Sequence, residues 1–180
     1  MTALPKYLAE GIEVLLETKI TSITLQGANW SVALEDGASI SSAAVLLTAP
    51  VPQSLALLDA GNFEMSADAR KRLEAIQYER CLAVLAVLDG PSRMSAPGAM
   101  SFEGGPLSWI TDNQLKGISP VPCVTLHASH AFSLENWNAN RENAGKILLE
   151  SVARWIHSKV KEMQVHGWLY SKPLRVHEEP

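Results

Sequence analysis

Apolar and polar residues alternate with a period of two through much of the first quarter of the chain, a pattern typical of strands with one buried face. The pattern predicts strands over residues 12–16, 20–25, 30–35 and 40–48. The links on either side of the third strand are short, and one of them contains Asp36-Gly37, which favours hairpin turns. Residues 19–48 are therefore predicted to form a three-stranded meander.

The last strand of this meander runs into Val45-Leu-Leu-Thr-Ala-Pro-Val-Pro-Gln53. A short apolar run closed by turn residues predicts a strand that is buried on both faces. Pro50 and Pro52 have no amide proton to donate, so the hydrogen-bond ladder must end there. The carboxyl end of such a strand is a common ligand position in α/β proteins.

Apolar residues recur every three or four positions in other parts of the chain, which predicts helices over 1–9, 53–58, 66–76 and 140–163. The last of these is the longest, with one apolar stripe formed by Ala144, Ile147, Leu148, Val152, Trp155, Ile156 and Val160. Further strands are predicted over 81–88, 107–111, 121–128 and 165–171, and a Pro-, Gly- and Ser-rich loop over 89–99. Trp155 is expected in the core.

The composition of the 180 residues, 47% hydrophobic and 19% charged, is that of a globular protein. A net charge of −4 without a basic cluster argues against nucleic acid as a partner. Since no apolar run approaches the roughly 20 residues of a membrane span, no membrane partner is expected. Cys81 and Cys123 lie in apolar runs, so they predict no disulfide scaffold and a cytoplasmic location.

Several residues could carry chemistry, each with a simpler structural alternative. Cys123, His127 and His130 include metal-binding residue types, but their spacing matches no common zinc site, which favours a core cysteine and a histidine at a pocket edge. Asp112-Asn113 could orient a ligand or simply form a turn. The sequence contains no G-x-S-x-G elbow, no Walker loop and no two glycines at G-x-G spacing.

Aromatic side chains form the clearest candidate site. His166, Trp168 and Tyr170 alternate onto one face of the predicted last strand. Three amphipathic rings on one strand face could line a pocket for a flat ligand. Alternatively, the same face could pack beneath the predicted helix 140–163.

The order of several sequence blocks resembles the flavin-containing amine oxidase superfamily, and most closely its renalase-like branch. The blocks are TKITSI at 18–23, VLLTAPVPQ at 45–53, LEAIQY at 73–78, WITDN at 109–113, VTLH at 124–127 and WLYS at 168–171. The resemblance implies an α+β fold, with a mixed, largely antiparallel sheet covered by helices as the substrate domain and a three-stranded meander from the FAD domain. It divides the chain into part of the FAD-binding domain (1–50), the substrate-binding domain (51–173) and a return segment (174–180).

The resemblance also implies a function and a set of site residues. Ile20, Thr48, Ala49 and Pro50 would line the FAD groove, and Tyr78, Trp109, Asn113, His127 and Trp168 would face the substrate side of the flavin. Hydride would pass from a dihydronicotinamide or amine substrate to the flavin, with oxygen as the acceptor and no catalytic side chain. Because the family's G-x-G-x-x-G strand is absent, we expect a middle fragment that is inactive alone, does not bind FAD and self-associates. The alternative is a non-catalytic binding or scaffold module that lacks the flavin half.

Overall fold

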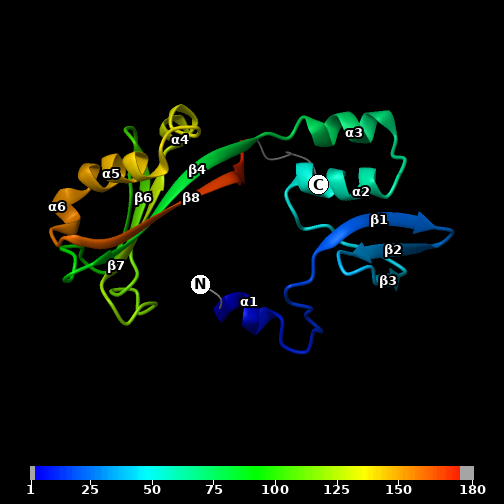
Figure 1. The fold of residues 1–180 in the computed structure, drawn as a ribbon, viewed down its shortest axis with the longest axis horizontal. Helices are drawn as coiled ribbons and strands as arrows, with labels where there is room; N and C mark the ends of the chain where they lie inside the picture. Colours follow the sequence, from blue (N-terminus) through cyan, green and yellow to red (C-terminus); the bar gives the residue numbers. More distant parts are fainter. Residues whose placement is uncertain (1–2, 175–180) are drawn as a thin grey trace. The chain divides into compact units, whose positions relative to one another are not determined.

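The computed structural model describes residues 3–174, which divide between Gln77 and Tyr78 into two compact units (Figure 1). The fold is α+β, and within the described residues each strand pair is antiparallel. The packing boundary at Gln77 lies beyond the functional boundary predicted at residue 50, and the assignment of residues to FAD and substrate domains stays a prediction. The predicted return segment 174–180 lies outside the described residues except for Leu174.

The first unit contains the predicted meander, in the order β1-β2-β3. Its elements are α1 (Ala3–Leu8), β1 (Ile20–Gln26), β2 (Asn29–Leu34), β3 (Ser39–Ser42), α2 (Val51–Ala60) and α3 (Ala67–Glu74). The Ser66 hydroxyl accepts a hydrogen bond from the Ala69 amide and so caps α3. Within the described residues, these elements confirm the predicted helices at 53–58 and 66–76 and the helix near the start of the chain.

A small core joins α2 to the meander through buried Ile23, Val32 and Leu58. The end of α2 approaches β1 so closely that a Cβ on Gly61 would lie 2.0 Å from the Ile23 carbonyl oxygen. Only a residue without a side chain fits there. Trp30 and Phe63 extend the core, with ring centroids 5.2 Å apart.

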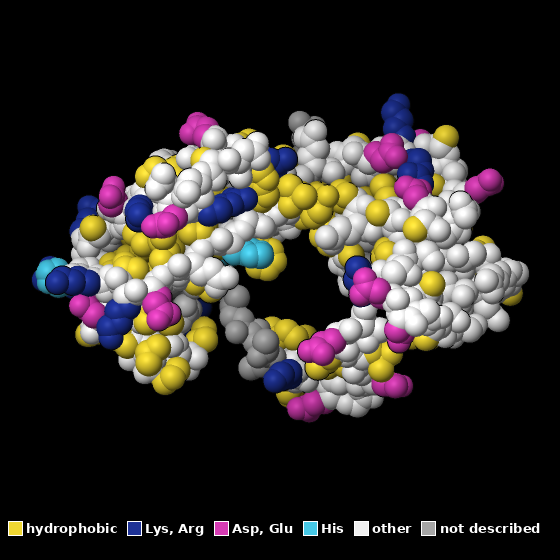
Figure 2. Space-filling model, viewed as in Figure 1, with side chains coloured by type: hydrophobic (Ala, Val, Ile, Leu, Met, Phe, Trp, Pro, Cys, Tyr) yellow, Lys and Arg dark blue, Asp and Glu magenta, His cyan; other side chains and the backbone are white. Residues whose placement is uncertain are grey.

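Of the predicted strands of this unit, 12–16 is wrong, and 40–48 is confirmed only in its first part, as β3. Residues 12–16 form no strand, and the hydrophobic side chains around them and on α1 are exposed (Figure 2). Residues 45–47 follow β3 as an irregular segment: Leu46 is 87% exposed, while Val45 and Leu47 pack on the small core. Neither run has a neighbouring strand among the described residues, and a strand needs that neighbour for its backbone hydrogen bonds.

The second unit is a five-stranded sheet in the order β5-β6-β7-β4-β8, with three helices on one side (Figure 1). Its elements are β4 (Tyr78–Leu88), β5 (Ala99–Ser101), β6 (Leu107–Asp112), β7 (Cys123–Ala128), α4 (His130–Glu135), α5 (Arg141–Ser151), α6 (Ala153–Ile156) and β8 (Val160–Pro173). The predicted strands of this half are confirmed, whereas β5 and α4 were not predicted.

The predicted helix 140–163 is wrong in its second half. The helix breaks at Val152, α6 ends at Ile156, and His157 takes a φ of 59°. Residues from Val160 onward belong to β8, where Val160 pairs with Leu88 and Met163 pairs with Ala86 of β4. The reason is tertiary: pairing with a long central strand satisfies more of this segment's backbone than a further helical turn would.

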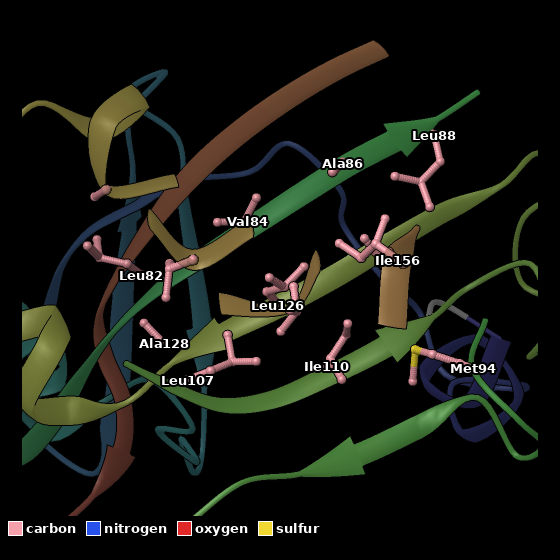
Figure 3. Close-up of a cluster of buried hydrophobic side chains, with 14 residues drawn as sticks. Leu82, Val84, Ala86, Leu88, Met94, Leu107, Ile110, Leu126, Ala128 and Ile156 are labelled. Carbon is pink, nitrogen blue, oxygen red and sulfur yellow. The ribbon is translucent and has the colours of Figure 1, made fainter. Parts of the chain in front are cut away.

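The main core lies between the sheet and its helices. Leu82, Val84, Ala86 and Leu88 project from β4 towards it, and the other strands and α6 add side chains such as Leu126, Ile110 and Ile156 (Figure 3). Trp155 lies at the edge of this core, half-buried, with its ring 5.1 Å from Phe102. Among residues 3–174, no helix has the length and apolarity to cross a membrane.

Candidate functional site

The sheet of the second unit has one face that its own helices leave uncovered, and we call this the open face. Side chains alternate along a strand, so the core side chains of β4 leave Cys81, Ala83, Leu85 and Val87 on the opposite side. On β8, a Cβ at Gly145 of α5 would meet Met163 and Val165, which places these residues on the covered side. The open face of β8 therefore carries Gln164, His166 and Trp168.

Strand register brings three aromatic rings into one row on the open face. Trp109 of β6 pairs with His127 of β7, His127 pairs with Ala83 of β4, and Ala83 pairs with His166 of β8. Since strands lie about 4.8 Å apart, His127 and His166 stand roughly 10 Å apart on either side of the short Ala83 side chain. Trp168 follows His166 on the same face, with its ring centroid 4.5 Å away.

A depression of about 290 Å³ lies beside this row at the next positions along the strands. Its lining includes Leu85, Val87, Asn113, Thr125 and Gln164. The Asn113 side-chain amide donates to the Thr125 hydroxyl at 2.9 Å, which fixes the orientation of the amide. The depression therefore offers hydrogen-bonding groups next to the aromatic row.

The centre of the open face is uncharged. Burial lowers the pKa of His127 below its ordinary value, so its ring is neutral near pH 7. Burial is also the main reason why the pKa of the Cys81 thiol is raised, which keeps it protonated and a poor nucleophile. The face suits a flat, uncharged ligand better than a charged one.

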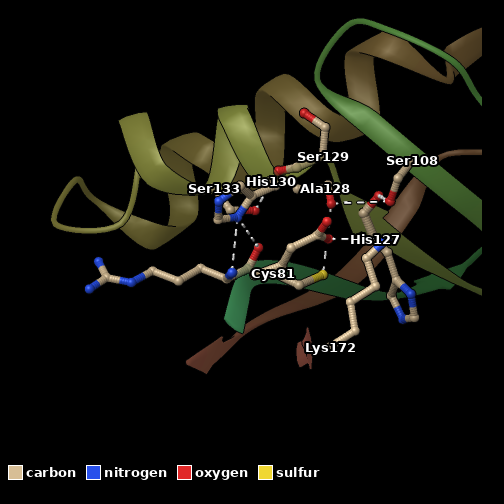
Figure 4. A network of polar contacts seen from close by, with 10 residues as sticks. Cys81, Ser108, His127, Ala128, Ser129, His130, Ser133 and Lys172 are labelled. Carbon is tan, nitrogen blue, oxygen red and sulfur yellow. Dashed lines mark hydrogen bonds and ion pairs between the residues drawn. The ribbon is translucent and has the colours of Figure 1, made fainter. Parts of the chain in front are cut away.

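His130, the other histidine considered for a metal site, stabilises the fold on the covered side of the sheet (Figure 4). Where β7 ends, α4 supplies hydrogen-bond partners to β4: the His130 Nδ1 accepts from the Arg80 amide at 3.0 Å, and the Ser133 hydroxyl accepts from the Leu82 amide at 3.0 Å. The Ser133 hydroxyl donates in turn to the Ser129 carbonyl at 2.7 Å. No group of three or more His, Cys, Asp or Glu residues is placed to hold a metal within the described part of the chain.

The turn alternative holds for Asp112. Its carboxylate accepts from the Leu115 amide at 2.8 Å and from the Ser92 hydroxyl at 2.5 Å, so both oxygens serve the local loops. Only its neighbour Asn113 reaches the depression.

Four of the five predicted substrate-side residues lie on the open face: Trp109, Asn113, His127 and Trp168. The fifth, Tyr78, lies at the start of β4 opposite Pro173, five residues from Ala83, with its ring 5.4 Å from that of Tyr170. The structure therefore does not bring Tyr78 into the aromatic row. Whether any of these residues contacts a substrate stays a prediction.

The predicted cofactor residues all belong to the first unit. Ile20 begins β1, and Thr48 and Ala49 lie in the irregular segment that leads to Pro50, the residue that precedes α2. The Ala49 carbonyl accepts a hydrogen bond from Ser54 at 3.0 Å. Their contact with a cofactor also stays a prediction.

Gln164 and Thr125 are residues of the open face that the sequence did not assign to the site, whereas His166 was predicted to share the aromatic face with Trp168. A signal for both existed, because Gln164 shares a strand face with His166, and Thr125 shares one with His127. The register that sets His127 and His166 on either side of Ala83 is long-range and could not be read from local pattern.

Comparison with known proteins identifies the family of this chain. The model of the flavin containing amine oxidoreductases matches residues 1–172. The chain belongs to this family. None of the curated proteins compared with this sequence matches it.

Several solved structures share the fold of this chain. A protein from Exiguobacterium sp. 255-15 assigned as a protoporphyrinogen oxidase is 17% identical with a TM-score of 0.66, over 95% of this chain and 39% of its own. A fatty acid isomerase from P. acnes that produces CLA is 15% identical with a TM-score of 0.64, over 93% and 39%. A triple mutant of putrescine oxidase is 13% identical with a TM-score of 0.67, over 90% and 36%. The chain thus spans about two fifths of the length of these structures.

Proposed function

We propose that this chain forms the substrate-facing wall, and part of the cofactor-binding region, of an FAD-dependent oxidoreductase. The observation that carries the proposal is the row of Trp109, His127 and His166 with Trp168 on the open face, in a chain whose family is defined by flavin. Flat aromatic side chains around a short residue favour a flat ring as ligand.

The residues present fit one part of FAD and leave another to segments outside this sequence. The uncharged open face fits a flavin ring with its substrate. The pyrophosphate needs a glycine-rich turn at a helix N-terminus, and the eleven glycines include no pair at G-x-G spacing. Ile20 and Thr48–Pro50 would hold the cofactor edge, as the family resemblance implies. The flavin would supply the acceptor for hydride, and oxygen would reoxidise it.

The chain's own residues would bind and orient the substrate and exclude water. Neutral His127 offers one ring nitrogen as donor and the other as acceptor, and Asn113 offers its side-chain carbonyl beside the row. Removing hydride requires no strong protein base. This agrees with a face that carries hydroxyls, amides and rings around Ala83 and no catalytic carboxylate pair.

The same chemistry favours a dihydronicotinamide substrate, as in the renalase-like branch, over a cationic amine. A buried ammonium group needs a carboxylate or an aromatic cage to replace its hydration. Two carboxylates stand equally far from the row along β4: Glu79, which is neutralised by Lys172 at 3.2 Å, and Glu162, which pairs with Val87 at the far side of the depression. A dihydronicotinamide ring is uncharged and can stack on Trp168 or Trp109.

The test compares side-chain truncations in the flavin-loaded enzyme to which this chain contributes. His127→Ala and Trp168→Ala should lower kcat/KM for the dihydronicotinamide on the order of tenfold or more with little change in Tm. Trp155→Ala, at the core edge, should do the reverse, because truncating a core Trp costs about 3 kcal/mol. If His127→Ala and Trp168→Ala lower Tm but spare the specific activity of the folded fraction, the two residues are packing residues and the proposal is wrong.

We further propose that the 180-residue chain alone does not bind FAD usefully, because the pyrophosphate would lack its amide donors. Titration of the chain into FAD, followed by flavin fluorescence, should show no saturation in the micromolar range. Saturation at low micromolar concentration would contradict this.

The second candidate function is a non-catalytic module that binds a flat ligand or another protein without flavin. The uncharged open face is compatible with both functions, but the family match favours the enzyme. A dihydronicotinamide that binds the chain but is not oxidised by any flavin-loaded form would favour the module.

We propose the cytoplasm as the location of the protein, because both cysteines are free thiols.

A further inference from the structure

On the covered side of the sheet, two arginines lie against one tryptophan. Trp137 lies in the link between α4 and α5, with the Cζ of Arg80 4.9 Å from its ring centroid and the Cζ of Arg141 at 4.7 Å. Both guanidinium groups therefore lie within about 10 Å of each other. Each gains from the ring's quadrupole, but the two positive charges repel each other.

The nearby carboxylates do not neutralise this pair. Glu79 precedes Arg80 but bonds Lys172 at 3.2 Å, and Glu142 follows Arg141 but bonds Lys146 at 2.6 Å. Neither arginine forms an ion pair with another residue of the described chain. Like charges that are held together without a counter-charge are unusual unless an anion binds there.

One nitrogen of the pair is already withdrawn from water. The Nη1 of Arg141 is buried and makes no hydrogen bond, and among the described residues it is the only buried side-chain nitrogen or oxygen of this kind. Such a donor destabilises the fold unless a partner satisfies it. Its surroundings are close-packed towards β8, where a Cβ on Gly167 would lie 3.0 Å from Arg141 Nη2 and 3.1 Å from the Trp137 ring, so a ligand can approach the guanidinium group only from the side away from that strand.

We propose that Arg80 and Arg141 form a binding site for an oxyanion, a phosphate or carboxylate group. The guanidinium fork of Arg141 matches two oxygens of such a group, and Arg80 adds a second positive charge. Arg141 is also the first residue of α5, where helix amides favour negative charge. The site lies on the opposite side of the sheet from the open face, so it is separate from the proposed flavin site and does not depend on it.

Two sources could supply the anion: a phosphate group of a small molecule, or a carboxylate of another polypeptide. The chain is titrated with inorganic phosphate and, separately, with acetate, at constant ionic strength in chloride. Binding is followed by calorimetry and by the side-chain Nε–H signal of Arg141 in NMR spectra. Saturable binding of either anion supports the site, and the tighter of the two identifies the source.

Variants then assign the binding to this cluster. Arg141→Gln should weaken it on the order of tenfold, and Arg80→Gln should weaken it to a smaller extent. Arg141→Lys keeps the charge but loses the fork, so it should also bind more weakly. Arg154→Gln is the matched control, because Arg154 stacks on Trp155 at 3.7 Å without a second arginine on that ring.

Two results would contradict the anion site. If neither anion binds saturably, or if Arg154→Gln weakens binding as much as Arg141→Gln, the proposal is wrong. Should Arg141→Gln fail to fold, Arg80→Gln and Arg141→Lys decide the question by the same comparison.

Discussion

His127 illustrates how one residue on the open face is tuned by its surroundings. Its ring lies in the aromatic row, half-buried, and burial is the cause of its lowered pKa. A neutral imidazole can donate and accept hydrogen bonds, whereas a charged one would repel a positively charged ligand. The chemistry available at this position therefore depends on how well the row excludes water.

This lowered pKa predicts a pH-dependent stability. The unfolded chain takes up the His127 proton near the ordinary pKa of 6.5, while the folded chain resists it. The free energy of unfolding should therefore be greatest above that value, fall as pH decreases through it, and level off below the folded-state pKa. Urea unfolding between pH 8 and pH 5 measures this, with His127→Gln as the comparison. If the variant keeps the full slope, His127 is not its source.

At the scale of elements, α4 completes the sheet where β7 ends. The Leu82 amide is deep in the core and has the Ser133 hydroxyl as its acceptor, so a helix side chain replaces a strand carbonyl. This explains why a six-residue helix, too short to be stable alone, is fixed in place.

Ser133→Ala should therefore destabilise the second unit by about 1–3 kcal/mol, because it leaves the Leu82 amide buried without an acceptor. Hydrogen exchange of that amide should accelerate to the same degree. Ser151→Ala is the control, since the Ser151 hydroxyl bonds the Leu148 carbonyl at an exposed position. Equal losses in the two variants would mean that the Leu82 contact contributes little.

Local pattern predicted those elements whose partners are near in sequence or whose periodicity is unambiguous. The meander β1–β3, α2, α3 and the buried strand β4 belong to this class. Local pattern gave the wrong secondary structure where pairing with a distant strand determines it. Residues 160–163 continue a helical stripe in the sequence but pair with β4. For the site, alternation predicted the face shared by His166 and Trp168, but only register could show that His127 lies across Ala83 from them.

At the scale of the whole molecule, the first unit has more apolar surface than its own core uses. Seven hydrophobic side chains between Leu4 and Leu16 are each more than half exposed: Leu4, Tyr7, Leu8, Ile12, Val14, Leu15 and Leu16. Soluble proteins rarely leave such a contiguous set uncovered. We propose that a second copy of the chain covers it, most simply as a two-fold dimer through this segment and the meander.

Sedimentation equilibrium should accordingly show a concentration-dependent dimer. Replacing Leu8 and Leu16 with Glu should weaken the association on the order of tenfold or more, because each charge would be buried in the interface. Leu134→Glu, at a position 50% exposed on α4, should leave it unchanged. A monomer at all concentrations, with strongly protected amides throughout residues 12–48, would contradict the proposal.

The division of β4 into two faces has a consequence for how such a protein can diverge. Leu82, Val84 and Ala86 maintain the fold, while Leu85 on the same strand is 45% exposed and contributes nothing to the main core. Mutations can therefore accumulate on the open face, altering what is bound there, while the free energy of folding stays nearly constant. Structures only 13–17% identical to this chain keep its fold with TM-scores of 0.64–0.67, as expected if selection acts on the two faces separately.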